Sequence, residues 1–371
     1  MLLQESQAAG TFVFIVDQTL TSQQGQKTEN TFSSGNRTRR PRKGRRYNAY
    51  KRARRSCHCF VKGLLLTPSG IRIPFSRPYY TKDYCAAKKR PYRTQTQLAA
   101  EMIAELPLPQ EAKVVVLGDT AFDAKSIRQA CDKRGYRWVV PLNPERVVAG
   151  PKGKRPKVRT LINGLKADQL ATIRLHAGQG PYVEQRRLSP CRVGPKVKPR
   201  TYYVHLRRQA VHSVGEVQLV FSSRKKPQAG QPVEVDKILM TNDLRLSARQ
   251  VVELYGLRWQ IELFFKELKS VLGFQQYRFR RFEQVEGWDE LIQVSFMYLE
   301  WYRLQQLARR DVPEEKKKWW RWQRTHGLCQ VVRAAAEQAD LQTIAERLQT
   351  PTGLQRLRRL LKGVLPQRGV A

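Results

Sequence analysis

The amino-acid sequence predicts an α/β fold in which a mixed β-sheet is flanked by helices. Over residues 11–143, short runs rich in β-branched and aromatic residues alternate with segments of helical periodicity, as in sheets that are covered on both faces. Between residues 144 and 232, glycine and proline signals separate short alternating runs, which indicates a β-rich insertion. A long amphipathic helix follows the insertion, and the carboxyl-terminal region has helical patterns with basic faces.

Two of the first predicted strands end at carboxylates. Residues 11–16 (TFVFIV) form a buried strand that ends at Asp17, and residues 112–119 (AKVVVLGD) form another that ends at Asp119. Carboxylates at such strand ends often belong to sites. Between them lie strands at 59–67 and 70–80 and a helix at 94–106, and after them come a helix at 123–135, capped by Asp123, and a strand at 136–143. Three strands, a helix, a strand, a helix and a strand is the order of a ribonuclease-H-like sheet.

These patterns divide the chain into four regions. Residues 1–143 are the first part of a ribonuclease-H-like domain and include a basic loop at 36–56, residues 144–232 are the β-rich insertion, residues 233–310 are the second part of the domain, and residues 311–371 are a basic helical region. Within the second part, a strand at 237–242 precedes a helix at 251–274, and Ser247 and Gln250 have the spacing of a capping box before it. A further helix at 288–309 is expected to pack against this one through Leu291, Val294, Met297, Tyr298, Trp301 and Leu304.

The helix at 251–274 has an unusual polar face. Its apolar residues fall on one side at about 100° per residue, and Tyr255, Arg258, Glu262 and Lys269 form a stripe on the other. Considered alone, the stripe fits a solvated face on which Arg258 and Glu262 pair four residues apart. The alternative is a site that combines one carboxylate, two cations and a phenol.

A large positive charge indicates a polyanionic partner. The 69 Lys and Arg residues against 31 Asp and Glu give a formal net charge of +38, which a nucleic acid would neutralise. Within the basic loop, which is otherwise a solvated segment, the expected phosphate contacts are Arg39, Arg40, Arg42, Lys43, Arg45 and Arg46. No apolar run reaches the roughly 20 residues that span a bilayer, so no membrane partner is expected. The six cysteines lack C-x-x-C spacing, which argues against a zinc finger.

Three carboxylates in this order suit two-metal phosphoryl transfer. Asp17 and Asp119 end strands of one sheet, and Glu262 comes from a helix that follows a further strand. Two Mg²⁺ or Mn²⁺ ions held about 4 Å apart stabilise the attacking and leaving oxygens of an in-line displacement, and hard cations prefer oxygen ligands. Arg258 and Lys269 would then grip the phosphates of the reacting strand, and Tyr255 would add a hydroxyl or stacking contact.

The stripe resembles a known signature. Tyr255, Arg258, Glu262 and Lys269 match the Tyr-x2-Arg-x3-Glu-x6-Lys (YREK) pattern of bacterial insertion-sequence transposases of the DDE class, in the large family that includes the insertion-sequence-four type. The run that ends at Asp17 and the segment GDTAFD at Asp119 are similar to the first and second acidic motifs of that family. The resemblance covers about residues 11–309.

The resemblance implies a function. It implies a cytoplasmic, nucleoid-associated bacterial transposase that binds the terminal repeats of its element as double-stranded DNA, cuts at the element ends and joins the freed 3′ hydroxyls to target DNA. Asp17, Asp119 and Glu262 would be catalytic ligands of two Mg²⁺ or Mn²⁺ ions, and Tyr255, Arg258 and Lys269 would contact phosphates of the transposon end. Synapsis of two ends implies a homodimer on DNA.

Two other functions compete with this one. Relatives carry a helical DNA-binding region before the first aspartate, whereas sixteen residues precede Asp17 here, so a truncated or inactive remnant that only binds DNA is the second hypothesis. A nuclease on the same fold, without sequence preference, is the third. The formation of a DNA hairpin stays open, because no tryptophan lies between Trp138 and Trp259 to hold a flipped base.

Overall fold

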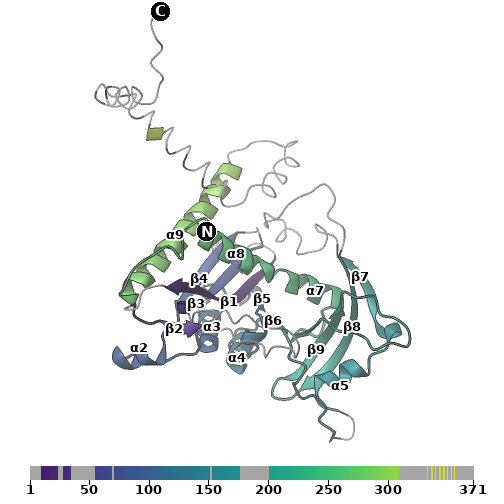
Figure 1. Ribbon diagram of the computed structural model, residues 1–371. Coiled ribbons are helices and arrows are strands. Elements are labelled where there is room, and N and C mark those ends of the chain that lie inside the picture. The colour runs from purple at the N-terminus through teal and green to yellow at the C-terminus, as the bar shows by residue number, and fades with distance from the viewer. Residues whose placement is uncertain are drawn as a thin grey trace, which may run out of the picture.

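The computed structural model describes residues 10–23, 28–34, 55–68, 71–150, 153–175 and 200–308, together with isolated positions between 332 and 355. Within these residues the chain forms a ten-stranded mixed sheet with helices on both faces (Figure 1). The predicted α/β class with a mixed sheet flanked by helices is thereby confirmed. The loop residues Arg39, Arg40, Arg42, Lys43, Arg45 and Arg46 and most of 311–371 lie outside the described residues.

The first half of the chain forms the core of the sheet in the order that the sequence predicts, with a short extra strand, β2, and a short extra helix, α2. The strands are β1 (Thr11–Gln23), β2 (Phe32–Ser34), β3 (Arg55–Leu66), β4 (Arg72–Pro78), β5 (Lys113–Leu117) and β6 (Arg137–Pro141). The helices are α2 (Lys82–Ala87), α3 (Gln95–Ala104), the 3₁₀ turn η1 (Thr120–Phe122) and α4 (Lys125–Lys133). β3 pairs with β1 and β4 in antiparallel fashion, whereas β1, β5 and β6 are parallel, which is consistent with a ribonuclease-H-like domain.

Residues 144–232, the predicted insertion, extend this sheet. Its elements are α5 (Val158–Asn163), η3 (Ala167–Gln169), β7 (Ala171–Leu175), β8 (Arg200–Val211) and β9 (Gly215–Ser223). β10 (Lys237–Thr241) is antiparallel to both β6 and β9, so it joins the first half of the sheet to the insertion strands. The remaining helices are α7 (Ala248–Gly256), α8 (Trp259–Ser270) and α9 (Phe282–Ala308).

Alternation along β1 divides the core into two layers. Phe12, Phe14 and Val16 are buried on the face that α3 and α4 cover, and Val13 and Ile15 are buried on the face that α7, α8 and α9 cover. Burial on both faces explains why this strand is a continuous apolar run in the sequence. Figure 1 shows α7, α8 and α9 crossing one side of the sheet and α3 and α4 lying on the other.

Three predicted boundaries are wrong. β1 does not end before Asp17 but continues to Gln23, because it pairs with β3 beyond the point at which its pairing with β5 stops. The helix predicted over 251–274 is divided into α7 and α8 at Leu257 and Arg258, whose backbone N–H groups bond to carbonyls three residues back instead of four. Asp123 does not cap α4; the cap is Ala124, and the carboxylate of Asp123 accepts hydrogen bonds from arginines instead.

The predicted apolar face of the last helix is also wrong. α9 does pack on α8, through Phe264 and Phe296, whose ring centroids lie 4.9 Å apart. However, Leu291, Val294, Tyr298 and Trp301 are exposed. The buried face carries Val285, Ile292, Phe296 and Leu299 together with the carboxylates of Asp289 and Glu300. These two acids interrupt the apolar pattern, because each is neutralised by a buried cation from the sheet.

Candidate active site

Two of the candidate carboxylates lie at the same level of neighbouring parallel strands, Asp17 within β1 and Asp119 just after β5. The last parallel pair between β1 and β5 is Ile15 with Leu117, and Asp17 and Asp119 each lie two residues further along the chain. Because side chains alternate along a strand, this spacing directs Asp17 to the face of Ile15, which α7 and α8 cover. Asp119 lies two residues after the end of β5 and accepts a hydrogen bond from the N–H of Ala121 at 2.8 Å, which caps the η1 turn.

The third carboxylate, Glu262, comes from the first turn of α8. Arg258 directly precedes this helix, and its guanidinium donates to Glu262 one turn later. The same guanidinium donates to Asp17 Oδ2 from Nη1 at 3.4 Å. Arg258 therefore links the strand carboxylate to the helix carboxylate and serves as their shared counter-cation.

The electrostatics of Asp17 reflect this crowding. The pKa of Asp17 is raised to about 6, mainly by burial and also by the charges of Asp119 and Glu262, against the opposing effects of the Gln18 N–H and Arg258. A carboxylate held out of water beside two others is short of positive charge. This is the environment that a bound cation stabilises.

The other two residues of the helical stripe, Tyr255 and Lys269, lie in different places. The centroid of the Tyr255 ring is 5.9 Å from the Arg258 guanidinium, so Tyr255 borders the carboxylates. Lys269 lies about 10 Å further along the helix than Glu262. Burial lowers the pKa of Lys269, and the titratable group that acts on it is the thiol of Cys57, which lies on β3 opposite Ser22. Lys269 is therefore adjacent to the far end of β1 and not to Asp17.

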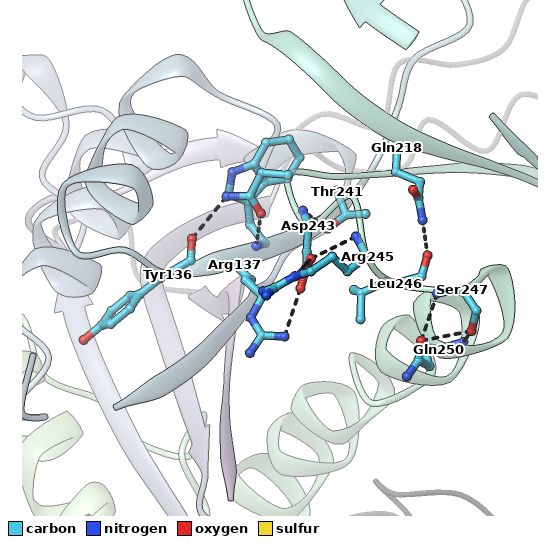
Figure 2. Close-up of polar contacts among 11 residues, drawn as sticks. Tyr136, Arg137, Gln218, Thr241, Asp243, Arg245, Leu246, Ser247 and Gln250 are labelled. Carbon is cyan, nitrogen blue, oxygen red and sulfur yellow. Dashed lines mark hydrogen bonds and ion pairs between the residues drawn. The ribbon is translucent and has the colours of Figure 1, made fainter. Parts of the chain in front are cut away.

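A network of polar contacts positions the start of α7, and with it Tyr255 and Arg258. Asn242 accepts from the Trp138 N–H at 2.9 Å, and Asp243 accepts from Arg137 at 3.0 Å and from Arg245, which secures the end of β10 to β6 (Figure 2). The side chain of Gln218 donates to the carbonyl of Leu246. The predicted capping box of Ser247 and Gln250 then begins the helix.

Two buried cations fix α8 and α9 against the strands. Lys62, the cross-strand partner of Asp17, is fully buried and pairs with Asp289 of α9. Arg72 of β4 donates to Glu267 of α8 at 2.7 Å and to Glu300 of α9 at 2.6 Å. Glu267 is five residues from Glu262, so the Arg72 pairs fix the helix that carries the third carboxylate.

Sequence reasoning missed Lys237 at this site. Its ammonium lies 4.7 Å from the centroid of the Tyr255 ring. Desolvation and then repulsion from Arg258 and Arg224 lower the pKa of Lys237, whereas Glu262 and Asp119 act in the opposite direction. Lys237 is one lysine among many basic residues in the sequence, and its only signal was its place at the start of the strand before the stripe.

The donor set at the carboxylates fits a hard divalent cation, since it consists of carboxylate oxygens alone. Within the described ranges, no three or more His, Cys, Asp or Glu side chains form a group that could hold a metal ion. In this arrangement the guanidinium of Arg258 takes up the charge of Asp17 and Glu262. Asp17, Asp119 and Glu262 would hold the ion. Arg258 would then give up its contacts with Asp17 and Glu262 and be available to other anionic groups.

A comparison with known families decides the identity. The family described as transposase DDE domain matches residues 9–297, which is most of the chain and includes Asp17, Asp119 and Glu262. This chain belongs to the transposase DDE domain family. DDE transposases cleave DNA and transfer strands, and they generally use divalent metals. A comparison with curated proteins gave no match. Every helix in the described part of this transposase-family chain is too short or too polar to cross a bilayer.

Proposed function

We propose that this chain is an insertion-sequence transposase of the YREK type, which cuts double-stranded DNA at the ends of its element and joins the freed 3′ ends to target DNA. The observation that carries the proposal is that the guanidinium of Arg258 links Asp17 to Glu262, while the charge of Asp119 acts on Asp17 from the neighbouring strand. The membership of the transposase DDE domain family supports it, because strand cleavage and transfer are the chemistry of that family.

The residues of the site have separate roles in this function. Asp17, Asp119 and Glu262 supply oxygen ligands to two Mg²⁺ or Mn²⁺ ions, which stabilise the attacking and leaving oxygens of an in-line displacement when bound. Arg258, which the carboxylates no longer need as counter-cation, turns to a phosphate of the DNA. Tyr255 lies beside it and borders the reacting strand.

The proposal extends to partners. Lys269 and the loop residues Arg39, Arg40, Arg42, Lys43, Arg45 and Arg46 contact DNA outside the carboxylate centre, which agrees with the net charge of +38. Two copies act together on paired element ends as a homodimer in the bacterial nucleoid. Because DNA contacts release counterions, binding weakens steeply with salt.

The test compares DNA cleavage by the wild type with DNA cleavage by the variant Glu262→Gln. The wild type and this variant are incubated with Mg²⁺ and a labelled duplex that carries the end of the element, and Glu290→Gln serves as the matched control, because Glu290 is an exposed carboxylate on α9. We expect the wild type and the control to nick at the element boundary and the Glu262 variant to bind the duplex without cutting. Binding of Mn²⁺, followed by electron paramagnetic resonance, should weaken only in the Glu262 variant.

Each other outcome identifies a different function. Cleavage by the Glu262 variant at the wild-type rate removes Glu262 from the chemistry. Binding without cleavage by all three proteins identifies the DNA-binding remnant. Cleavage of every duplex, with or without the element end, identifies the nuclease.

A further inference from the structure

Lys237 lies at the same edge of the sheet as the carboxylates. β10 is antiparallel to β6, with Leu239 opposite Pro141, so the amino end of β10 meets the carboxyl ends of β5 and β6. Leu239 is buried on the face that α7 and α8 cover, and Lys237, two residues earlier, shares that face by alternation. Lys237 therefore shares a face of the sheet with Asp17, and it lies at the edge where Asp119 follows β5.

The ammonium of Lys237 has a defined position without a neutralising partner. It lies over the Tyr255 ring, 4.7 Å from the centroid, at an exposed position at the start of β10. Among the residues that the structure describes, no carboxylate makes an ion pair with Lys237. A ring face attracts a cation through its quadrupole, so N–H groups that point away from the ring stay available for another acceptor.

The other cations near the centre are engaged or distant. The guanidinium of Arg258 is bound to Asp17 and Glu262, and Lys269 lies beside Cys57. Arg224 is an exposed side chain that pairs with Asp236. Lys237 is thus a cation at this edge that can bind a phosphate while Arg258 is still paired with Asp17 and Glu262.

We propose that Lys237 is a DNA-contacting residue of this site, whose ammonium binds a backbone phosphate of the strand that the carboxylates act on, with the Tyr255 ring as its support. This inference rests on the proposed function, since it names a further contact of the same site. A lysine suits the task because its compact ammonium can donate to phosphate oxygens from varied directions. The contact positions the strand and takes no part in bond making.

The test compares Lys237→Gln, Lys237→Arg and the control Lys113→Gln. Lys113 is also an exposed first residue of a strand, but β5 runs parallel to β1, so Lys113 lies at the edge opposite to the carboxylates. Binding of a fluorescein-labelled duplex with the element end is measured at several salt concentrations with Ca²⁺ in place of Mg²⁺. We expect Lys237→Gln to reduce the slope of log affinity against log salt by about 0.9, and Lys237→Arg and Lys113→Gln to keep the wild-type slope.

A neutral methylphosphonate at single positions of the duplex then locates the contact. At the contacted phosphate, the wild type should lose affinity to the level of Lys237→Gln, and the variant should lose nothing more. Thermal unfolding of all four proteins gives the structural readout, and we expect it to be the same for each.

The outcomes separate this inference from the proposed function. If the wild type cuts at the element end and Lys237→Gln matches it in salt slope and affinity, the Lys237 contact is refuted and the transposase function stands. If Lys237→Gln and Lys237→Arg both bind the duplex more weakly than the wild type and both unfold at a lower temperature, Lys237 is a structural support of α7. The contact is then again refuted. If the wild type fails to bind the element end, the proposed function itself fails.

Discussion

Replacement of Asp17 by asparagine should stabilise the metal-free protein near neutral pH. Burial and the neighbouring carboxylates raise the pKa of Asp17 from 3.8 to about 6, so the folded state disfavours its ionised form. A raised pKa means that the native state holds the proton more tightly than the unfolded state does. Stability therefore falls as the pH rises through the window from 3.8 to about 6, and below this window the carboxyl is protonated in both states.

The size of the effect follows from the two pKa values. Their difference corresponds to a destabilisation of about 3 kcal/mol above pH 6, because each pKa unit is worth about 1.4 kcal/mol. The Asp17 side chain is only 15% exposed, so solvent screens this energy little. Asparagine has nearly the same shape and no charge, and it should recover most of this energy.

Urea unfolding in the presence of a chelator measures the prediction. The variant and the wild type should have similar stability near pH 4 and differ by about 3 kcal/mol near pH 7. The exposed Asp132 provides the control, and Asp132→Asn should leave the pH dependence of the wild type unchanged. Added Mn²⁺ should then stabilise the wild type more than the Asp17 variant, because the ion binds the folded carboxylates. A variant that is less stable than the wild type near pH 7 without metal would refute the reasoning, since the carboxylate would then be stabilising.

Two further predictions concern the packing around the site, and urea unfolding measures both. Arg72→Met should destabilise the protein by about 3–5 kcal/mol, because it leaves two buried carboxylates without their cation. The control Arg93→Met removes an exposed pair and should cost less than about 1 kcal/mol; equal losses would contradict a buried clamp. Gly63→Ala should destabilise by about 1–3 kcal/mol, because its Cβ would lie 2.3 Å from a ring carbon of Phe14. Gly287→Ala on α9 meets no atom within 4 Å and should stabilise by up to about 1 kcal/mol, and a loss there would contradict the packing described.

Local patterns in the sequence were sufficient for much of the fold. The apolar run before Asp17 and the run before Asp119 are strands that are buried on both faces, which is why each is a continuous apolar run in the sequence. The capping box at Ser247 and Gln250 is present as predicted, because it depends on residues three apart. The pairing of Arg258 with Glu262, which the spacing of four residues suggested, is also present.

Contacts between distant parts of the chain decided the rest. The exposed side of α9 has the more regular apolar pattern, whereas its buried side includes Asp289 and Glu300, whose partners Lys62 and Arg72 are more than 200 residues away. Helical periodicity cannot indicate that a carboxylate is buried when its counter-cation comes from another element.

The sequence by itself determined the order of the elements and the excess of positive charge, and it pointed to the candidate carboxylates. Only the tertiary structure decided that Arg258 bridges Asp17 and Glu262 and that Lys269 lies away from them. It also decided that Lys237 joins the site, since the antiparallel pairing of β10 with β6 brings the start of one strand to the ends of others. Register and pairing are properties of the assembled sheet, and they determine which charges share one edge.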